Sequence, residues 1–436
     1  MQLKRLQLGL IHVAVAMTLV PINSTLNRVM IKELALSATL VALLASLPFL
    51  FSPIQVVIGS YSDRHPIFGL RRSPYILVGL LLCVLGLVIS PAAAYLMSRN
   101  FSAGLFACAL AFGAWGMGYN LSSVSYLSLA SELSGEHGRG KTIATMWFMM
   151  ILAIIATSIG LSHLLDPYSF ERLVLSFGLV AVAALIVGTL GLVKLEPHFR
   201  LDTSFSQAVP YTLKQMSAAV TSNPVARIFF VYLLLLLAAI LGQDVLLEPF
   251  GAEAFGLSIT QTTRITSVWG TFVLVAIILA GFLEGRLKKR VVAQFGNLGA
   301  LVGFLTILLS GITRSDSIFY SGVILLGFGT GLSTVANLSL MFDLTVPGQV
   351  GLFIGAWGFS NSLSRLTGSM LAGAVRDLIT QATGAALTGY LVVFGLEAGM
   401  LMVAVLMLGR IDVQAFKGKI KEPGFTEKIA LAVEGP

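Results

Sequence analysis

Two ionisable residues, Arg365 and Glu397, fall deep inside long apolar runs of the sequence. A charged side chain is costly at the centre of a bilayer, so such residues are the first candidates for a functional site. Arg365 lies ten residues from the outer end of its run, and Glu397 lies thirteen residues from the outer start of the next. At 1.5 Å per residue these depths are about 15 and 20 Å. We predict that the two pair or share a water-filled cavity, and structural pairing and ligand contact explain them equally well.

Two other segments, residues 21–34 and 243–251, concentrate polar groups at the ends of apolar runs. Both combine amides, acids and a proline, in a pattern that could hold a polar ligand. Their candidate binding residues are Asn23, Asn27, Arg28, Glu33, Gln243, Asp244 and Glu248.

The elements that must position these residues are membrane helices. Hydrophobic residues make up 56% of the 436-residue chain and charged residues only 11%, against roughly 25% charged residues in soluble domains. A spanning helix needs about 20 apolar residues. The apolar runs predict an all-α integral membrane protein with twelve transmembrane helices, near residues 6–28, 35–59, 73–97, 102–131, 141–165, 172–193, 225–246, 261–283, 291–312, 317–342, 350–375 and 384–409.

The positions of Lys and Arg predict the orientation of these helices. If successive spans cross the membrane in opposite directions, 20 of the 28 basic residues lie on one side of the membrane and seven on the other. Arg365 lies inside a span. Because cytoplasmic loops carry the excess of Lys and Arg, both termini are predicted to be cytoplasmic. The one long connection divides the chain into a six-helix bundle at 1–198, a cytoplasmic linker at 199–223, a second six-helix bundle at 224–412 and a cytoplasmic tail at 413–436.

The two halves of the sequence also repeat each other. Residues 121–124 match 332–335, and residues 127–129 match 338–340 at the same offset. The fourth predicted span is therefore the counterpart of the tenth. Two six-helix bundles related by an internal repeat are the organisation of the major facilitator fold.

The loop after the second span resembles the loop signature of the major facilitator superfamily. Its matching residues are Gly59, Asp63, Arg64, Gly69, Arg71 and Arg72. In that superfamily the aspartate and the first arginine of the loop close the cytoplasmic gate. The resemblance implies that Asp63 lies near Gly351 and that Arg64 lies near Glu132, whereas a charged loop that simply obeys the positive-inside rule is the plainer explanation.

Over roughly residues 6–410 the chain resembles one branch of that superfamily, the PucC/LhaA or bacteriochlorophyll-delivery family. Three segments carry the resemblance: P-x-N-S-x-L-N-R at 21–28, S-D-R-H-P at 62–66 and Q-D-x-L-L-E-P-F-G at 243–251. The resemblance implies a role in assembling light-harvesting or photosystem proteins, with chlorophyll or bacteriochlorophyll as the pigment. It also implies a photosynthetic membrane (thylakoid or intracytoplasmic) or an inner membrane as the location.

Chlorophyll magnesium accepts an axial imidazole, amide or carboxylate ligand. His12, Asn120 and Asn337 lie inside predicted spans and are therefore pigment-ligand candidates, together with Asn23 and Gln243. Polar residues inside membrane bundles more often form hydrogen bonds between helices. That structural role is the simpler explanation for any one of these residues.

Three functions remain open: a pigment-handling assembly factor, a secondary transporter for a small solute or tetrapyrrole, and a structural subunit that moves nothing. A proton-coupled transporter needs a titratable carboxylate near the midplane, and the sequence offers only Glu397. The sequence has no phosphate-binding glycine loop, metal-ligand cluster or nucleophile–base pattern, so we expect no enzyme, no catalytic residue and no metal site. We expect the lipid bilayer and no nucleic acid among its partners, because topology already explains the basic face.

Overall fold

The computed structural model of the chain describes residues 2–51, 54, 61–62, 65–197, 220–221, 223–283, 286–345 and 350–420, and almost all of them are helical. Contacts divide the chain into two compact units. The first unit comprises Met1–Gln207 and Asp244–Gly270, and the second comprises Ala208–Gln243 and Thr271–Pro436. The segment Asp244–Gly270 belongs to the second half of the sequence but packs within the first unit. The predicted division into bundles, linker and tail rests on the long connection between predicted spans and not on contacts, and it stays a prediction.

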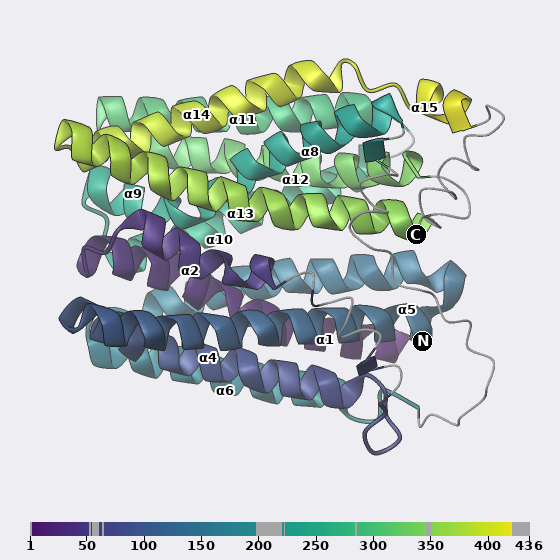
Figure 1. Ribbon diagram of the computed structural model, residues 1–436, viewed down its shortest axis with the longest axis horizontal. Helices are drawn as coiled ribbons and strands as arrows, with labels where there is room; N and C mark the ends of the chain where they lie inside the picture. Colours follow the sequence, from purple (N-terminus) through teal and green to yellow (C-terminus); the bar gives the residue numbers. More distant parts are fainter. Residues whose placement is uncertain are drawn as a thin grey trace, which may run out of the picture. The chain divides into compact units, whose positions relative to one another are not determined.

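The helices of the first unit begin with α1 (Gln2–Met17), which leads into two π-helical turns, η1 (Pro21–Leu26) and η2 (Val29–Glu33). Figure 1 shows α4 (Ser73–Arg99) and α6 (Phe170–Leu192) running alongside each other. The remaining helices of this unit are α2 (Ala38–Leu50), α5 (Phe101–Leu164), α9 (Leu247–Phe255) and the beginning of α10 (Ile259–Leu283).

The second unit contains the rest of α10 and five further long helices. In it α11 packs against α12 and α14, and α8 packs against α13 and α14. These helices are α8 (Pro224–Gly242), α11 (Lys289–Thr313), α12 (Asp316–Asp343), α13 (Val350–Thr383) and α14 (Ala386–Leu408), followed by the short α15 (Val413–Ile420).

Among the described residues, ten helical stretches are long and apolar enough to cross a membrane. The chain is therefore a multi-pass integral membrane protein. The predicted span at 35–59 corresponds to the shorter α2, and most of residues 52–60 lie outside the described part of the chain. The predicted span at 350–375 falls within α13, which is not among the ten. The number of twelve and the cytoplasmic termini stay predictions.

The 64-residue helical run α5 contains two of these stretches, Phe101–Ser134 and Gly140–Leu164. In a straight helix, residues eight apart are separated by about 12 Å along the axis. Ser134 Oγ nevertheless donates a hydrogen bond to Thr142 Oγ1 at 2.7 Å. The run therefore does not continue as one straight helix between its two candidate spans, which correspond to the predicted spans at 102–131 and 141–165.

Small residues bring neighbouring helices into direct backbone contact. A Cβ atom on Gly118 of α5 would lie 2.4 Å from the carbonyl oxygen of Gly79 on α4. In the second unit, a Cβ atom on Gly329 of α12 would lie 2.2 Å from the amide nitrogen of Ala300 on α11. Gly118 and Gly329 are counterparts in the sequence repeat, so both copies use a glycine for the same close helix packing.

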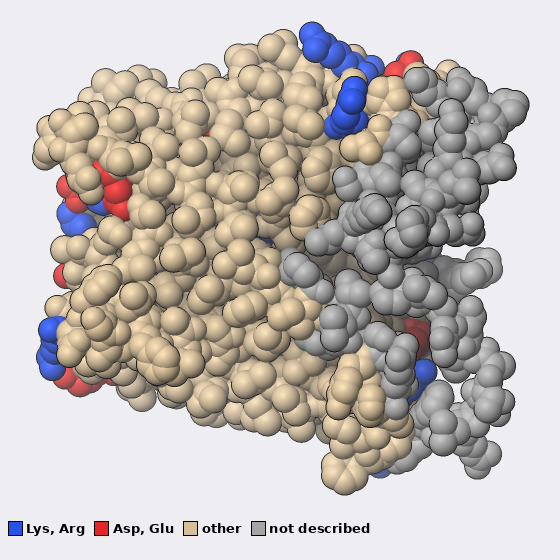
Figure 2. Space-filling view, in the orientation of Figure 1, with Lys and Arg blue, Asp and Glu red and all other residues tan. Residues whose placement is uncertain are grey.

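The charged residues gather near the ends of the helices. On the face that Figure 2 shows, the described Lys, Arg, Asp and Glu side chains lie toward the helix ends, and the middle of each unit is uncharged. Several helices begin where an Asn or Ser side chain accepts a hydrogen bond from a backbone amide of the first turn, as Asn100 does from Ala103. An uncharged middle section between capped helix ends is what a lipid environment requires.

Candidate functional site

The two polar segments that the sequence singled out meet inside the first unit. After α1 ends at Met17, the chain forms the π-helical turns η1 and η2, with Pro21 at the start of η1. Such wider turns occur frequently at functional sites, because they displace side chains from the regular helical positions. Here they bring Ser24 and Arg28 toward α9, which carries Glu248, and toward α10, which carries Thr266. We call Ser24, Arg28, Glu248 and Thr266 the carboxyl cluster.

Glu248 is the centre of the carboxyl cluster and is only 4% exposed. Its Oε1 atom accepts a hydrogen bond from the Ser24 hydroxyl and another from Thr266 Oγ1 at 2.8 Å. Thr266 Oγ1 also lies 3.2 Å from Ser24 Oγ. The carboxyl group therefore ties η1, α9 and α10 together through one of its two oxygens.

Arg28, the basic member of the carboxyl cluster, contacts residues outside the cluster. Its guanidinium forms an ion pair with Glu33, and its Nη2 donates to the carbonyl oxygen of Leu257 at 3.2 Å. Nearby, Lys32 forms a more exposed ion pair with Glu253 of α9. Of the candidates in residues 21–34, Arg28 and Glu33 are therefore paired with each other, and Arg28 contacts the chain beyond α9.

Three buried polar atoms of this region have no hydrogen-bond partner within the described part of the chain: Asn27 Oδ1, Arg28 Nε and Glu248 Oε2. The Asn27 amide nitrogen donates a hydrogen bond to the backbone carbonyl oxygen of Asn23 at 2.7 Å. A buried polar atom without a partner costs about 1–3 kcal/mol. Asn27 Oδ1 and Glu248 Oε2 can therefore accept a hydrogen bond from a water molecule or a ligand, Arg28 Nε can donate one, and Glu248 can bind a proton.

The electrostatics of Glu248 follow from this geometry. Glu248 lies on α9, outside the ten candidate spans. Burial raises the pKa of its carboxyl group from 4.5 to about 7, while the Ser24 and Thr266 hydroxyls and the charge of Arg28 act in the opposite direction. Near neutral pH, Glu248 is thus divided between its protonated and charged forms.

His12 is a buried polar residue on α1, on the side of the helix that faces α5. It is 7% exposed, and its Nδ1 atom has no hydrogen-bond partner among the described residues. Its ring lies 5.0 Å from the ring of Tyr126 and 6.0 Å, edge-on, from that of Trp147. Trp147 is 47% exposed, so the aromatic group around the imidazole extends to the surface of the unit.

Asn120 and Asn337, the two amides predicted inside spans, both form hydrogen bonds between or along helices. The Asn120 amide nitrogen donates to the carbonyl oxygens of Pro48 and Gly116. In the second unit, Asn337 Oδ1 accepts from Tyr232, and its amide nitrogen donates to Ser333. The simpler structural role therefore describes these amides.

Tyr232 and Asn297 complete that buried network and were missed by the sequence reasoning. Asn297 Nδ2 donates to the Tyr232 hydroxyl at 2.8 Å, and Asn297 Oδ1 accepts from Ser333 at the same distance. The network joins α8, α11 and α12. An isolated Tyr or Asn in an apolar run was the only signal in the sequence, and it does not specify the partner.

The remaining deep candidates are distributed over both units. In the second unit, Glu397 is 3% exposed, and a Cβ atom on Gly242 would lie 2.9 Å from its Oε1. Gln243 is buried there too, and Arg365 is half-buried on α13. Asp244 belongs to the first unit. The pairing of Arg365 with Glu397 stays a prediction.

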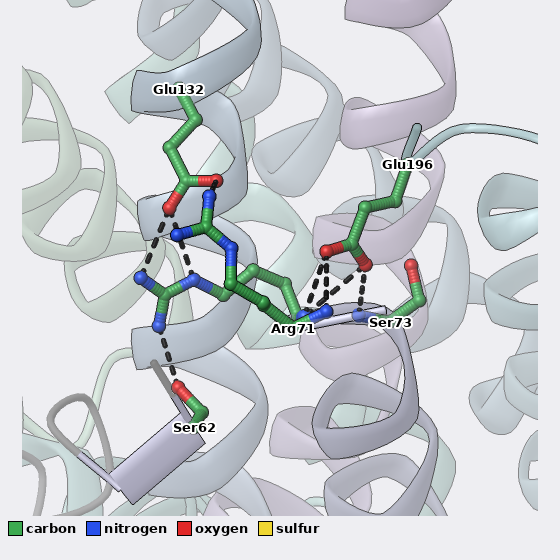
Figure 3. A network of polar contacts seen from close by, with 6 residues as sticks. Ser62, Arg71, Ser73, Glu132 and Glu196 are labelled. Carbon is green, nitrogen blue, oxygen red and sulfur yellow. Dashed lines mark hydrogen bonds and ion pairs between the residues drawn. The ribbon is translucent and has the colours of Figure 1, made fainter. Parts of the chain in front are cut away.

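At the other end of the first unit, the loop before α4 forms a second polar site (Figure 3). Arg72 donates to Glu132 Oε1 from Nε at 3.2 Å and from Nη2 at 3.0 Å, and to Ser62 Oγ at 2.6 Å. Arg71 Nη2 lies 3.4 Å from Glu132 Oε2. Glu132 therefore pairs with the basic pair of the loop signature. Its expected partner Arg64, together with Gly59 and Asp63, lies outside the described residues, and the surroundings of Gly351 are likewise not described.

Glu196 anchors the same loop from the chain that follows α6. Its carboxylate accepts hydrogen bonds from the backbone amides of Arg71 at 2.8 Å, Arg72 at 3.0 Å and Ser73 at 2.7 Å. Gly69 has a φ of 74°, a left-handed conformation that turns the chain just before these amides. A carboxylate on the free amides at a helix start also interacts favourably with the helix dipole. Sequence reasoning missed Glu196, because it lies about 125 residues beyond its partners.

We predict that Glu196→Ala lowers the stability of the protein by about 1–2 kcal/mol, because three amides at the start of α4 lose their acceptor. The measurement is thermal unfolding in detergent, followed by tryptophan fluorescence. Glu196→Gln keeps one oxygen acceptor and should lie between the wild type and Glu196→Ala. Equal stability of wild type and Glu196→Ala would show that the loop does not depend on this carboxylate.

Within the described part of the chain, no group of three or more His, Cys, Asp or Glu side chains is placed to hold a metal ion. The polar sites are instead a carboxyl cluster, a single buried imidazole and an arginine–glutamate network. These sites can bind protons, donate or accept hydrogen bonds, or supply one axial ligand.

Comparison with known proteins places these sites in a family context. The family model described as "PUCC protein" matches residues 25–416. Protein PucC of Cereibacter sphaeroides is 32% identical over 93% of this chain and 91% of its own length. A protein of Rhodobacter capsulatus named "Bacteriochlorophyll synthase 44.5 kDa chain" is 29% identical over 92% of this chain and 93% of its own length.

Solved structures show the fold. A bacterial homologue of the human lysosomal transporter Spinster has a TM-score of 0.74 at 14% identity, covering 96% of this chain and 98% of the other. The fold is therefore that of the major facilitator transporters, as the internal repeat predicted. Together with the family model and the identity to PucC, these similarities show that the chain belongs to the PUCC protein family.

Proposed function

We propose that this protein is a membrane assembly factor for photosynthetic pigment–protein complexes and that it binds or delivers a chlorophyll-type pigment. The observation that carries the proposal is the match to the PUCC family over residues 25–416. Support comes from the similarity, over 92% of this chain, to a protein named for bacteriochlorophyll synthase. Its partners would be light-harvesting or photosystem proteins in the photosynthetic membrane, and its role would be binding rather than catalysis.

His12 is the residue best suited to hold the pigment. A neutral imidazole is a common metal ligand through either ring nitrogen, and magnesium in a chlorophyll takes one axial ligand. The Nδ1 atom of His12 is buried and has no protein partner among the described residues. Tyr126 and Trp147 beside it offer the flat aromatic surfaces against which a tetrapyrrole ring can pack. Asn120 and Asn337 are poorer candidates, because their amide groups are engaged in hydrogen bonds.

We predict that His12→Phe lowers the pigment recovered with the purified protein at least tenfold while the protein itself accumulates normally. Phenylalanine fills similar apolar space but supplies no axial ligand. The measurement is the absorbance of protein purified in mild detergent from a pigmented host, relative to its protein content. His163→Phe is the matched control, since His163 is exposed near the end of α5. Equal pigment content in the two variants would remove His12 from the site.

Transport of a small solute or of a tetrapyrrole is the second candidate function, because the structural relatives include transporters. Uptake by the purified protein in liposomes tests it directly. Saturable uptake of a solute, without pigment or photosynthetic proteins in the native preparation, would favour transport. Stable, stoichiometric association with a photosynthetic complex would favour the third possibility, a structural subunit.

A further inference from the structure

The segment Asp244–Gly270 is held on the first unit by a small set of polar contacts. Lys32 of η2 pairs with Glu253, and Arg28 donates to the carbonyl of Leu257. Ser158 and Ser162 of α5 bond to the beginning of α10, at the Thr263 carbonyl and at Arg264 respectively. The contact between Ser24 and Glu248 is buried as well, and it is the one of these contacts that involves a buried carboxyl group. The segment is thus fastened near its surface by an ion pair and in its interior by buried hydrogen bonds, among them those of the Glu248 carboxyl group.

Among the described residues, the buried carboxyl group of Glu248 is hydrogen-bonded through one of its two oxygens. Glu248 Oε1 accepts from two hydroxyls, whereas Oε2 is buried and has no partner within the described residues. A buried carboxylate with an unsatisfied oxygen carries a large desolvation penalty. Adding one proton removes the charge and leaves both hydroxyl bonds to Oε1 in place. Burial therefore favours the neutral acid, and this effect outweighs the two hydroxyl donors, which favour the carboxylate.

From this arrangement we propose that Glu248 is a proton-binding site, and that its proton fastens the segment Asp244–Gly270 to η1 of the first unit. When the carboxyl group is deprotonated, the fastened arrangement must bury a charge, and the arrangement that exposes Glu248 to water becomes relatively more favourable. Proton binding by Glu248 does not depend on pigment binding.

The other charged and titratable groups around Glu248 are already engaged or lie further toward solvent. Arg28 is the nearest positive charge, and it is shared with Glu33 and the Leu257 carbonyl. Lys32 and Glu253 neutralise each other at the surface. Asp244 begins the segment, and Arg264 of α10 donates to Ser162. Tyr168 lies close enough to sense Arg28 and Glu33, and burial raises the pKa of its phenol, so it stays neutral.

The direction of the pH effect follows from linkage. Fastening raises the pKa of Glu248 from 4.5 to about 7, so the fastened form binds the proton more tightly. Fastening is then strongest at and below pH 4.5, and it weakens about tenfold for each pH unit as the pH rises toward 7. Above pH 7 both arrangements are deprotonated, and no further change is expected from this group.

The test measures the position of the segment on the full-length protein in lipid nanodiscs. Spin labels at Ser102→Cys on α5 and Gln261→Cys on α10 report the distance between two exposed sites of the first unit. The native cysteines, Cys83 and Cys108, are buried and should label poorly. We expect one narrow distance distribution at pH 5, and a second population that grows as the pH rises to 8. Glu248→Gln, which imitates the neutral acid, should keep the narrow distribution at both pH values.

Glu171→Gln is the control, because Glu171 is an exposed acid on α6, outside both the segment and the carboxyl cluster; this variant should retain the wild-type pH response. Ser24→Ala provides an independent readout if Glu248→Gln does not fold. The Ser24 hydroxyl stabilises the carboxylate, so its removal should move the midpoint of the pH response upward. A wild-type distribution that does not change between pH 5 and 8, or a Glu248→Gln response equal to that of the wild type, would overturn the proposal.

Discussion

Gly118→Ala is expected to destabilise the protein by about 3 kcal/mol, near the upper end of the usual cost of overpacking a core. The new Cβ atom would lie 2.4 Å from the carbonyl oxygen of Gly79 and 2.5 Å from the amide nitrogen of Cys83. Both are backbone atoms, so no side chain can rotate away, and α4 and α5 must separate. Close approach through small residues is a main source of helix association in lipid, where apolar burial contributes little.

Gly113→Ala is the matched control for this prediction. Gly113 lies five residues earlier on the same helix, and a Cβ atom there would meet nothing within 4 Å. Alanine favours a helix by about 1 kcal/mol over glycine, so this variant should be as stable as the wild type or slightly more stable. Thermal unfolding in detergent measures both variants. Equal melting temperatures for Gly118→Ala and Gly113→Ala would mean that α4 and α5 do not pack as described.

Arg72→Ala should lower the free energy of unfolding by about 2–3 kcal/mol, because a buried guanidinium loses several hydrogen bonds to a partner that is 33% exposed. The Arg72 guanidinium makes two bonds to Glu132 and one to Ser62, and the residue is 5% exposed. After the substitution, the contact to Arg71 at 3.4 Å is the one ion pair that Glu132 keeps among the described residues. Arg72→Lys keeps the charge but loses the planar two-point contact, so an intermediate loss is expected.

The control for this prediction is Lys289→Ala in the second unit. Lys289 pairs with Asp343 at 2.8 Å, but the two side chains are 44% and 31% exposed. Exposed pairs of this kind contribute at most about 1 kcal/mol, so unfolding should change little. Both variants are measured by the same thermal unfolding in detergent. If Arg72→Ala and Lys289→Ala had the same effect, the network in Figure 3 would not stabilise the loop.

Sequence patterns predicted the membrane class of this protein and much of its helix order, because a bilayer requires long apolar helices and shows them in the sequence. The polar segments at 21–34 and 243–251 were also identified, and the structure brings Ser24 and Glu248 from them into contact. Polar groups at helix ends are visible as interruptions of apolar runs. Their mutual contact is not, since it depends on how distant helices pack.

Two features lay beyond sequence reasoning for that same reason. Glu196 caps a helix that begins more than 120 residues before it, and nothing in its local sequence distinguishes it from an ordinary loop acid. Likewise, the bond between Tyr232 and Asn337 joins residues 105 apart. The superfamily pattern also directed attention to Arg64 as the partner of Glu132, whereas the described contacts of Glu132 come from Arg71 and Arg72.

The two polar regions of the first unit suggest separate tasks within one function. The imidazole of His12 lies among aromatic rings in the apolar core and suits a pigment. The carboxyl cluster lies where the segment Asp244–Gly270 is fastened and suits a proton.

The most direct test of the central proposal is purification of the wild-type protein and of His12→Phe in mild detergent from a pigmented photosynthetic host. Absorbance and mass spectrometry identify what accompanies each protein. We predict that the wild type carries a chlorophyll-type pigment together with light-harvesting or photosystem proteins, and that His12→Phe loses the pigment. A wild-type protein that is reproducibly colourless and free of photosynthetic proteins would contradict a role in pigment–protein assembly.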